Sequence, residues 1–179
     1  MSVAIRAEAS GDRAAVRQLH LAAFGDEGTV VTDLVEELRA EGLSLVAEDD
    51  GEVVGHVLFV PGWLDAPRQL VPVRTLSPLG VLPGRQGRGI GSALVRAGLA
   101  ALADRGVPVV FLEGDPGFYG RLGFVAGAEL GFRRPSLRIP QAAFQAVLLP
   151  AYEPWMTGTH VYAEAFWRHD AVGLRDPQS

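Results

Sequence analysis

The sequence of 179 residues contains no cysteine, no lysine and no asparagine. Without cysteine the chain can form no disulfide, no thiolate metal site and no cysteine nucleophile. Without lysine it can form no lysine Schiff base and cannot carry the lysine of a nucleotide phosphate loop. All 16 basic residues are therefore arginines, and the 21 acidic residues leave a net charge of −5.

Long apolar runs are also missing, although 48% of the residues are hydrophobic. No window reaches the ~18 consecutive apolar residues of a membrane helix, and no basic region followed by an apolar run opens the chain. An acidic chain without a basic stripe is poorly suited to nucleic acid. We therefore expect a cytoplasmic protein that binds neither membranes nor nucleic acid, and whose ligand is a small polyanion.

Hydrophobic periodicity and turn residues predict an α/β protein. Strands are expected at residues 3–6, 43–48, 52–60, 70–82, 107–112, 124–126 and 160–166, with a loop at 61–67. Helices are expected at residues 10–24, 29–40, 89–104 and 116–122. An antiparallel front half followed by an α/β back half predicts a single domain over residues 1–179. Its central sheet is expected to be mixed, mostly antiparallel and covered by helices on both faces.

A glycine-rich loop before the longest helix is the most informative segment. An apolar run ends at Pro83, and four glycines and two arginines follow before an alanine- and leucine-rich stretch. Glycine lets a ligand approach the main chain closely, and a helix start offers unpaired N–H groups and the positive end of a dipole. The loop therefore predicts a phosphate site, to which Arg85 and Arg88 add positive charge.

Several ligand classes use glycines in this position. A mononucleotide phosphate loop requires a lysine and is excluded. A dinucleotide fingerprint requires a third small residue where Leu94 stands, although Glu113 lies at a suitable distance for its acidic partner. The pattern Gln/Arg-x-x-Gly-x-Gly/Ala is met by Gln86, Gly89 and Gly91. A turn that binds nothing is the remaining alternative, but so many glycines are costly in conformational entropy.

Two segments together resemble a known superfamily. Residues 79–94 resemble the coenzyme A loop of the GNAT acetyltransferases, and residues 114–124 resemble that superfamily's Phe-Tyr-x-x-x-Gly-Phe element. The order of elements agrees across residues 1–126, which would form the core, with 127–179 as a C-terminal extension on the acceptor side. The sequence of the second element is similar to that of one bacterial branch of predicted acetyltransferases, the YhbS-like proteins.

The resemblance implies where acetyl-CoA binds. The pyrophosphate would lie on the amides of the loop, and the pantetheine arm would run between splayed parallel strands at residues 76–82 and 107–112. Main-chain groups at 79–81 would bond the arm and direct an N–H at the thioester oxygen. The residues implied to bind the coenzyme are Leu79, Gly80, Val81, Arg85, Gln86, Gly87, Arg88, Gly89, Ile90, Gly91 and Ser92.

Acid and base candidates follow from the second element. The resemblance implies that Tyr119 protonates the departing thiolate, and a phenol is a suitable acid for this step. Glu113, at the end of its strand, is our first choice for the general base, with an ion-paired carboxylate as the alternative. Asp115 is expected to cap the following helix, and His56 to be a hydrogen-bonded core histidine. No histidine or carboxylate spacing indicates a metal site.

The sequence departs from the superfamily pattern in two respects. Gly80 and the pair Gly84-Arg85 replace bulkier or acidic residues, and no asparagine follows the strand at 107–112. The expected activity is transfer of acetyl from acetyl-CoA to a primary amine, by direct attack in a ternary complex. The acceptor is a small molecule or a peptide, a homodimer is left open, and the alternative function is a non-catalytic acyl-CoA-binding module.

Overall fold

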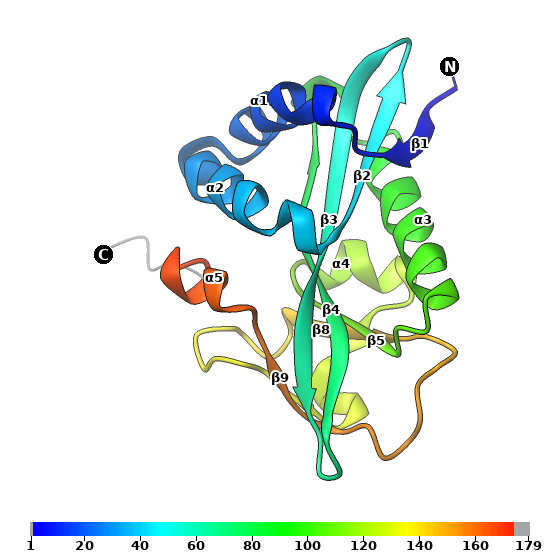
Figure 1. Cartoon of the computed structure of the whole chain (residues 1–179), viewed down its shortest axis with the longest axis vertical. Coiled ribbons are helices and arrows are strands. Elements are labelled where there is room, and N and C mark those ends of the chain that lie inside the picture. Colours follow the sequence, from blue (N-terminus) through cyan, green and yellow to red (C-terminus); the bar gives the residue numbers. More distant parts are fainter. Residues whose placement is uncertain (1, 174–179) are drawn as a thin grey trace. The chain divides into compact units, whose positions relative to one another are not determined.

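The computed structural model describes residues 2–173 (Figure 1). The helices are α1 (Arg13–Phe24), α2 (Gly28–Leu38), α3 (Ile90–Asp104), α4 (Pro116–Tyr119) and α5 (Glu164–Arg168). The strands are β1 (Ala4–Ala7), β2 (Leu43–Asp49), β3 (Glu52–Asp65), β4 (Leu70–Val81), β5 (Val109–Glu113), β6 (Val125–Ala126), β7 (Phe132–Arg133), β8 (Phe144–Leu148) and β9 (Gly158–Val161).

The chain forms two compact units. The first unit comprises the chain up to Val60 together with Leu76–Ala101, and the second comprises Pro61–Thr75 and the chain from Leu102. Strands β3 and β4 and helix α3 each contribute residues to both units.

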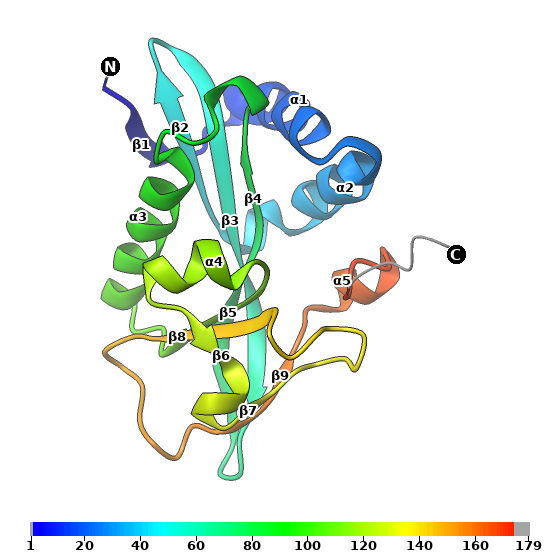
Figure 2. The same ribbon diagram turned by 180° about the vertical axis from the view of Figure 1, so that it is seen from behind.

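The first unit is a layer of strands between helices. Strand β1 pairs antiparallel with β2, and β2 pairs antiparallel with β3. Figures 1 and 2 show α1 and α2 on one side of these strands and α3 on the other. Alternation along β3 explains this, because His56 reaches His20 of α1 while its neighbour Gly55 meets Leu94 of α3.

Glycines let α3 pack closely on this layer. A Cβ placed on Gly98 of α3 would lie 2.1 Å from the ring of Phe59, and one on Gly55 would lie 2.9 Å from Leu94. Phe59, Val57 and Leu94 are fully buried. The short distance between α3 and the sheet is therefore possible only because Gly55 and Gly98 have no side chain.

The second unit is built around β5. Strand β5 pairs parallel with β4 through Arg74–Val110 and Thr75–Phe111, and antiparallel with β8 over its whole length. Strand β6 also pairs with β8, whereas β9 pairs antiparallel with β3 and parallel with β7. The core holds stacked or edge-on rings from four residues: Phe111, Phe132, Phe144 and His160.

The expected fold class is confirmed: the protein has a mixed, mostly antiparallel sheet with a parallel β4–β5 pair and flanking helices. The predicted loop at 61–67 is wrong for its first part, because β3 continues to Asp65. Buried Gly62 and Leu64 alternate there with exposed Trp63 and Asp65, which is the period of a strand.

The C-terminal third contains further corrections. Residues 160–166 are not one strand, since β9 ends at Val161 and the short helix α5 follows. Five residues are too few to separate helical from strand periodicity. Strand β8 lies in a stretch for which we predicted no element, because its second residue, Gln145, interrupts the apolar pattern. That side chain is buried and donates to the carbonyl of Gly114 (3.0 Å).

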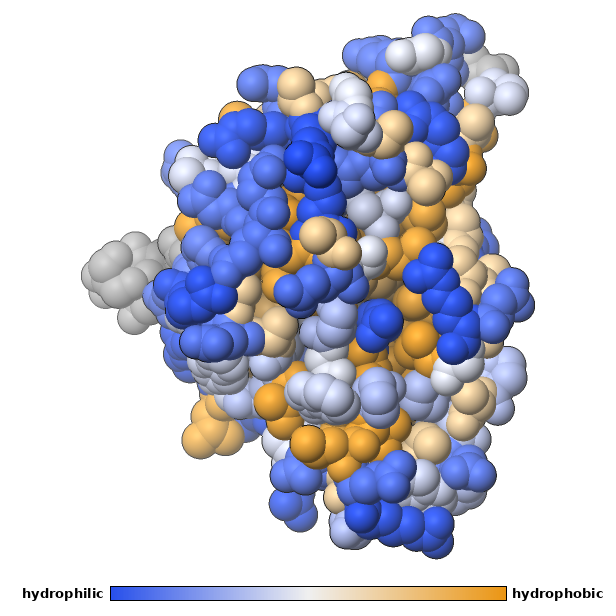
Figure 3. Space-filling model, viewed as in Figure 1, coloured by the Kyte–Doolittle hydropathy of each residue, from blue (hydrophilic) through white to orange (hydrophobic). Residues whose placement is uncertain are grey.

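The surface of the second unit carries exposed apolar side chains. Trp63 and Val161 face each other in the β3–β9 register and are 46% and 38% exposed. Figure 3 shows apolar residues gathered over the lower parts of β3 and β4. Within residues 2–173, no helix is both long enough and apolar enough to span a bilayer.

Replacing Gly98 by alanine tests the packing of α3. In most helices this change is stabilising, but here the new methyl would overlap the buried ring of Phe59. We expect Gly98→Ala to lower the free energy of unfolding by about 1–3 kcal/mol, measured by urea denaturation. Gly11→Ala is the control, because Gly11 has open space around its Cα. Equal stability of Gly98→Ala and wild type would contradict the close approach.

Candidate functional site

The glycine loop leads from the end of β4 into α3 within the first unit. Gly87 and Gly89 have φ of +75° and +81°, which side chains rarely tolerate. A Cβ at Gly84, Gly87 or Gly89 would meet no atom within 4 Å, so the space beside this main chain is open. The first helical bond runs from Ala93 N–H to the carbonyl of Gly89 (3.0 Å).

The start of α3 therefore has the features of an anion site. The N–H groups of the first turn, at Ile90, Gly91 and Ser92, have no carbonyl within the helix to bond. They carry the positive end of the helix dipole, and the open loop gives a ligand access to them. The chain thus has the cradle that a phosphate group requires, in the place that the sequence predicts.

The two arginines of the loop differ in their surroundings. Arg85 is held by the β2–β3 hairpin, through an ion pair to Asp49 and a second to Glu52 (3.1 Å). The side chain of Arg88 is exposed. Gln86 donates to the carbonyl of Val81 (3.1 Å), which closes the loop on the end of β4. Arg88 is thus the arginine with the greater freedom to reach a bound phosphate.

A chain of buried polar side chains crosses the first unit. Ser44 donates to the carboxylate of Glu8, His56 Nε2 lies 2.8 Å from the Ser44 hydroxyl, and His56 Nδ1 lies 2.7 Å from His20 Nε2. Because the Ser44 proton is used on Glu8, its oxygen must accept from His56 Nε2–H. With a neutral His56, its Nδ1 accepts from His20 Nε2–H, which leaves a lone pair on His20 Nδ1.

That lone pair faces β4. A Cβ on Gly80 would lie 2.6 Å from His20 Nδ1, so only glycine fits against the imidazole. Among the residues that the structure describes, His20 Nδ1 has no hydrogen-bond partner. The prediction that His56 is a hydrogen-bonded core histidine is confirmed. Its pairing with His20 was missed, because nothing in the sequence indicates a contact between residues 36 positions apart.

Charges around this chain keep its members in fixed protonation states. Burial lowers the pKa of His20 to about 3, and the neighbouring His56 adds to the effect. Burial opposes ionisation of Glu8, but hydrogen bonds from His56, Ser44 and Arg39 lower its pKa to about 2.

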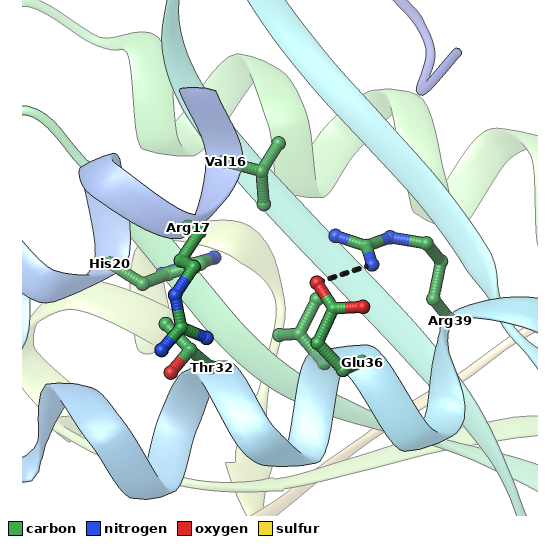
Figure 4. Close-up of a pocket in the computed structure, with 7 residues that line it drawn as sticks. Val16, Arg17, His20, Thr32, Glu36 and Arg39 are labelled. Atoms are coloured by element: carbon green, nitrogen blue, oxygen red, sulfur yellow. Dashed lines mark ion pairs between the residues drawn. The ribbon is translucent and has the colours of Figure 1, made fainter. Parts of the chain in front are cut away.

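His20 also lines a pocket between α1 and α2, whose rim carries the Glu36–Arg39 ion pair (2.9 Å; Figure 4).

Tyr119 lies at the end of α4 in the second unit. Its ring contacts Phe118 and Phe124, and a Cβ on Gly114 would lie 2.7 Å from it. Asp115 caps this turn by accepting from the N–H of Gly117 (2.9 Å), as the sequence predicted. Burial raises the pKa of Tyr119 to about 12, so the phenol keeps its proton at neutral pH.

The carboxylate of Glu113 is already engaged. It accepts from the Tyr162 hydroxyl (2.6 Å) and from the main-chain N–H of Gly173 (3.0 Å). Burial raises the pKa of Glu113, and these two hydrogen bonds oppose the rise. The role of general base for Glu113 stays a prediction, and it would require these contacts to weaken.

The predicted site residues divide between the two units. The coenzyme residues, Leu79 to Ser92, are continuous in the first unit, whereas Glu113 and Tyr119 belong to the second. Within the described part of the chain, no group of three or more histidine, aspartate or glutamate side chains could hold a metal ion. His160 lies in an aromatic stack and bonds the Thr75 hydroxyl (2.9 Å).

The mixed sheet with a parallel β4–β5 pair and the glycine loop at the start of α3 agree with the resemblance to the GNAT acetyltransferases. The family model of the acetyltransferase (GNAT) domain matches residues 4–127 of this chain. The protein therefore belongs to the GNAT acetyltransferase family.

Related sequences include proteins named as acetyltransferases. The chain is 37% identical over 120 residues to the uncharacterized N-acetyltransferase YjhQ of Escherichia coli, a match that covers 63% of this chain and 64% of YjhQ. It is 38% identical to a mycothiol acetyltransferase of Nocardia farcinica, over 71% of this chain and 42% of that protein. The chain thus spans less than two thirds of the length of these curated relatives.

Two solved structures are similar to more than nine tenths of this chain. The crystal structure of YhbS from Escherichia coli in complex with CoA has a TM-score of 0.80 and 32% identity, covering 93% of this chain and 92% of YhbS. A GNAT acetyltransferase from Brucella melitensis in complex with acetyl-CoA has a TM-score of 0.73 and 36% identity, covering 92% and 98%.

Because two histidines are buried with lowered pKa values, we predict that acid lowers the free energy of unfolding. Burial lowers the pKa of His20 and of His160 to about 3, from an ordinary value of 6.5. Below pH 6.5 the unfolded chain takes up protons that the folded chain does not. The free energy of unfolding should therefore fall as pH drops from 6.5 towards 3, by up to about 1.4 kcal/mol per pH unit for each histidine.

Urea denaturation at a series of pH values measures this slope. His20→Gln should reduce it, because one of the two depressed groups is removed while His160 keeps its contribution. A free energy of unfolding that stays constant from pH 7 to pH 5 would contradict the assignment of neutral histidines.

Proposed function

We propose that this protein transfers an acetyl group from acetyl-CoA to a primary amine, by direct attack of the amine in a ternary complex. The observation that carries the proposal is the glycine loop at the start of α3, where a Cβ at Gly84, Gly87 or Gly89 would meet no atom within 4 Å and the first-turn N–H groups have no carbonyl partner within the helix. Membership of the GNAT family supports it, as do the two related structures, which hold CoA and acetyl-CoA.

The chain's residues take separate roles in this proposal. The loop Gln86–Ser92 binds the pyrophosphate through its amides, and Arg88 adds a charge-assisted contact to a phosphate. Main-chain groups of Leu79, Gly80 and Val81 hold the pantetheine arm and donate an N–H to the thioester oxygen. Bound acetyl-CoA supplies the activated acetyl thioester.

Tyr119 would donate the proton that the departing thiolate takes up. The phenol is fully protonated before the reaction, but burial raises its pKa and so makes it a weaker acid than an ordinary phenol. No hydrogen bond to its hydroxyl is formed by a described residue, so the group is available. Glu113 would act as the general base only after its hydrogen bonds from Tyr162 and Gly173 are released.

That engaged carboxylate favours one alternative, a non-catalytic acyl-CoA-binding module. The two functions differ in thiol release, which requires transfer to an acceptor. An assay of free coenzyme A over a panel of small-molecule and peptide amines separates them. Binding of acetyl-CoA without release of thiol for any amine would favour the binding module.

Gly89→Glu tests the coenzyme site. A carboxylate here repels the phosphates, and glutamate is strained at a φ of +81°. We expect acetyl-CoA affinity, measured by calorimetry, to fall by at least about tenfold, the loss of one charged contact. Gly106→Glu is the matched control, because it adds the same charge at a φ of +75° just after α3. Equal loss in both variants would reject the placement.

Tyr119→Phe tests the general acid. Removing one oxygen should lower turnover by ~10²–10⁴-fold, the usual contribution of general acid catalysis, while acetyl-CoA affinity stays nearly unchanged. Tyr152→Phe removes a hydroxyl from another tyrosine of the second unit and should leave turnover intact. Unchanged turnover in Tyr119→Phe would show that water protonates the thiolate, and lost affinity would show that the hydroxyl holds the ligand.

A further inference from the structure

The β2–β3 hairpin brings two carboxylates together. Asp50 and Gly51 form its two-residue turn with φ of +50° and +80°, as in a type I′ turn. Asp49 and Glu52 are therefore direct partners in the antiparallel register, and side chains of such partners lie on the same face. Two like charges in this arrangement repel each other unless a cation lies between them.

Arg85 is that cation. Its Nη1 pairs with Asp49 and its Nη2 with Glu52, so one guanidinium bridges both carboxylates. The Asp49 side chain is only 5% exposed. Withdrawing Arg85 to a ligand would leave a nearly buried carboxylate unpaired beside a second negative charge, which is strongly unfavourable.

The loop that follows Arg85 needs an anchor of this kind. Gly87 and Gly89 give the main chain access to many conformations, whereas phosphate binding requires one of them. Among residues 2–173, the Gln86 side chain bonds only to the carbonyl of Val81, within the same segment. The Arg85 ion pairs connect the loop to a different element, the hairpin, whose own conformation is fixed by its strand pairing.

We propose that Arg85 is a positioning residue, which holds the glycine loop in its coenzyme-binding conformation by bridging Asp49 and Glu52 and does not itself contact the coenzyme. The inference rests on the proposed function for its effect on coenzyme affinity. It assigns the phosphate contact to Arg88 alone, where the sequence left both arginines as candidates.

The sign of the Asp49→Asn effect decides between the two roles. If Arg85 positions the loop, loss of the Asp49 charge loosens the loop and weakens coenzyme A binding. If Arg85 contacts a phosphate, the same change frees the guanidinium and strengthens binding. Asp50→Asn is the matched control, because it removes the same charge from the exposed turn, and asparagine tolerates the positive φ there.

The first measurement is hydrogen exchange of the loop amides in the coenzyme-free protein. Arg85→Gln and Asp49→Asn should each raise exchange at residues 86–92 by about fivefold or more, as expected when an anchor on a local opening is lost. Arg88→Gln and Asp50→Asn should leave it unchanged. Exchange rates that do not respond to Asp49→Asn would overturn the proposal.

The second measurement is coenzyme A affinity by calorimetry. Arg85→Gln and Asp49→Asn should each weaken binding by about fivefold or more, and the double variant should be no weaker than the weaker single, because both remove one interaction. Tighter binding by Asp49→Asn would overturn the proposal. If the wild type binds no coenzyme A, the proposed function fails, while the exchange rates still decide whether Arg85 anchors the loop.

Discussion

The first unit depends on how closely its helices approach its strands, and positions without a side chain set that distance. Gly55 and Gly98 bring α3 onto β3, and Gly80 brings the imidazole of His20 onto β4. At each of these positions a methyl group would overlap an atom that is fully buried. A close-packed interior transmits the displacement that such an overlap would cause. The position of the glycine loop at the start of α3 therefore also depends on contacts made further along the helix.

Close approach on the α1 side also explains why the core of this unit is partly polar. Glu8, Ser44, His56 and His20 are enclosed with their hydrogen bonds running in one direction. At one end of the network the Glu8 carboxylate forms an ion pair with Arg39 (2.9 Å), so its charge is balanced. A buried network of this kind specifies one arrangement of α1 and β3, because any other arrangement leaves its members without partners.

Local features of the chain could be predicted from the sequence, whereas contacts between distant segments could not. The hairpin at Asp50-Gly51, the glycine loop and the Asp115 cap depend on residues a few positions apart, and they lie where the pattern indicates. The His20–His56 pair joins distant segments, as does the bridge from Arg85 to the hairpin. In the C-terminal third, β8 and α5 are too short for periodicity to identify them, and the conformation of β8 depends on its pairing with β5 and β6.

The bridge between Asp49, Glu52 and Arg85 also constrains how this protein can diverge. Loss of Arg85 alone leaves a nearly buried carboxylate unpaired beside a second negative charge, so that substitution passes through a less stable protein. Arg85 is therefore expected to persist wherever Asp49 is present. A homologue without arginine at position 85 should also lack the carboxylate at position 49, and its glycine loop would then need a different attachment to the body of the fold.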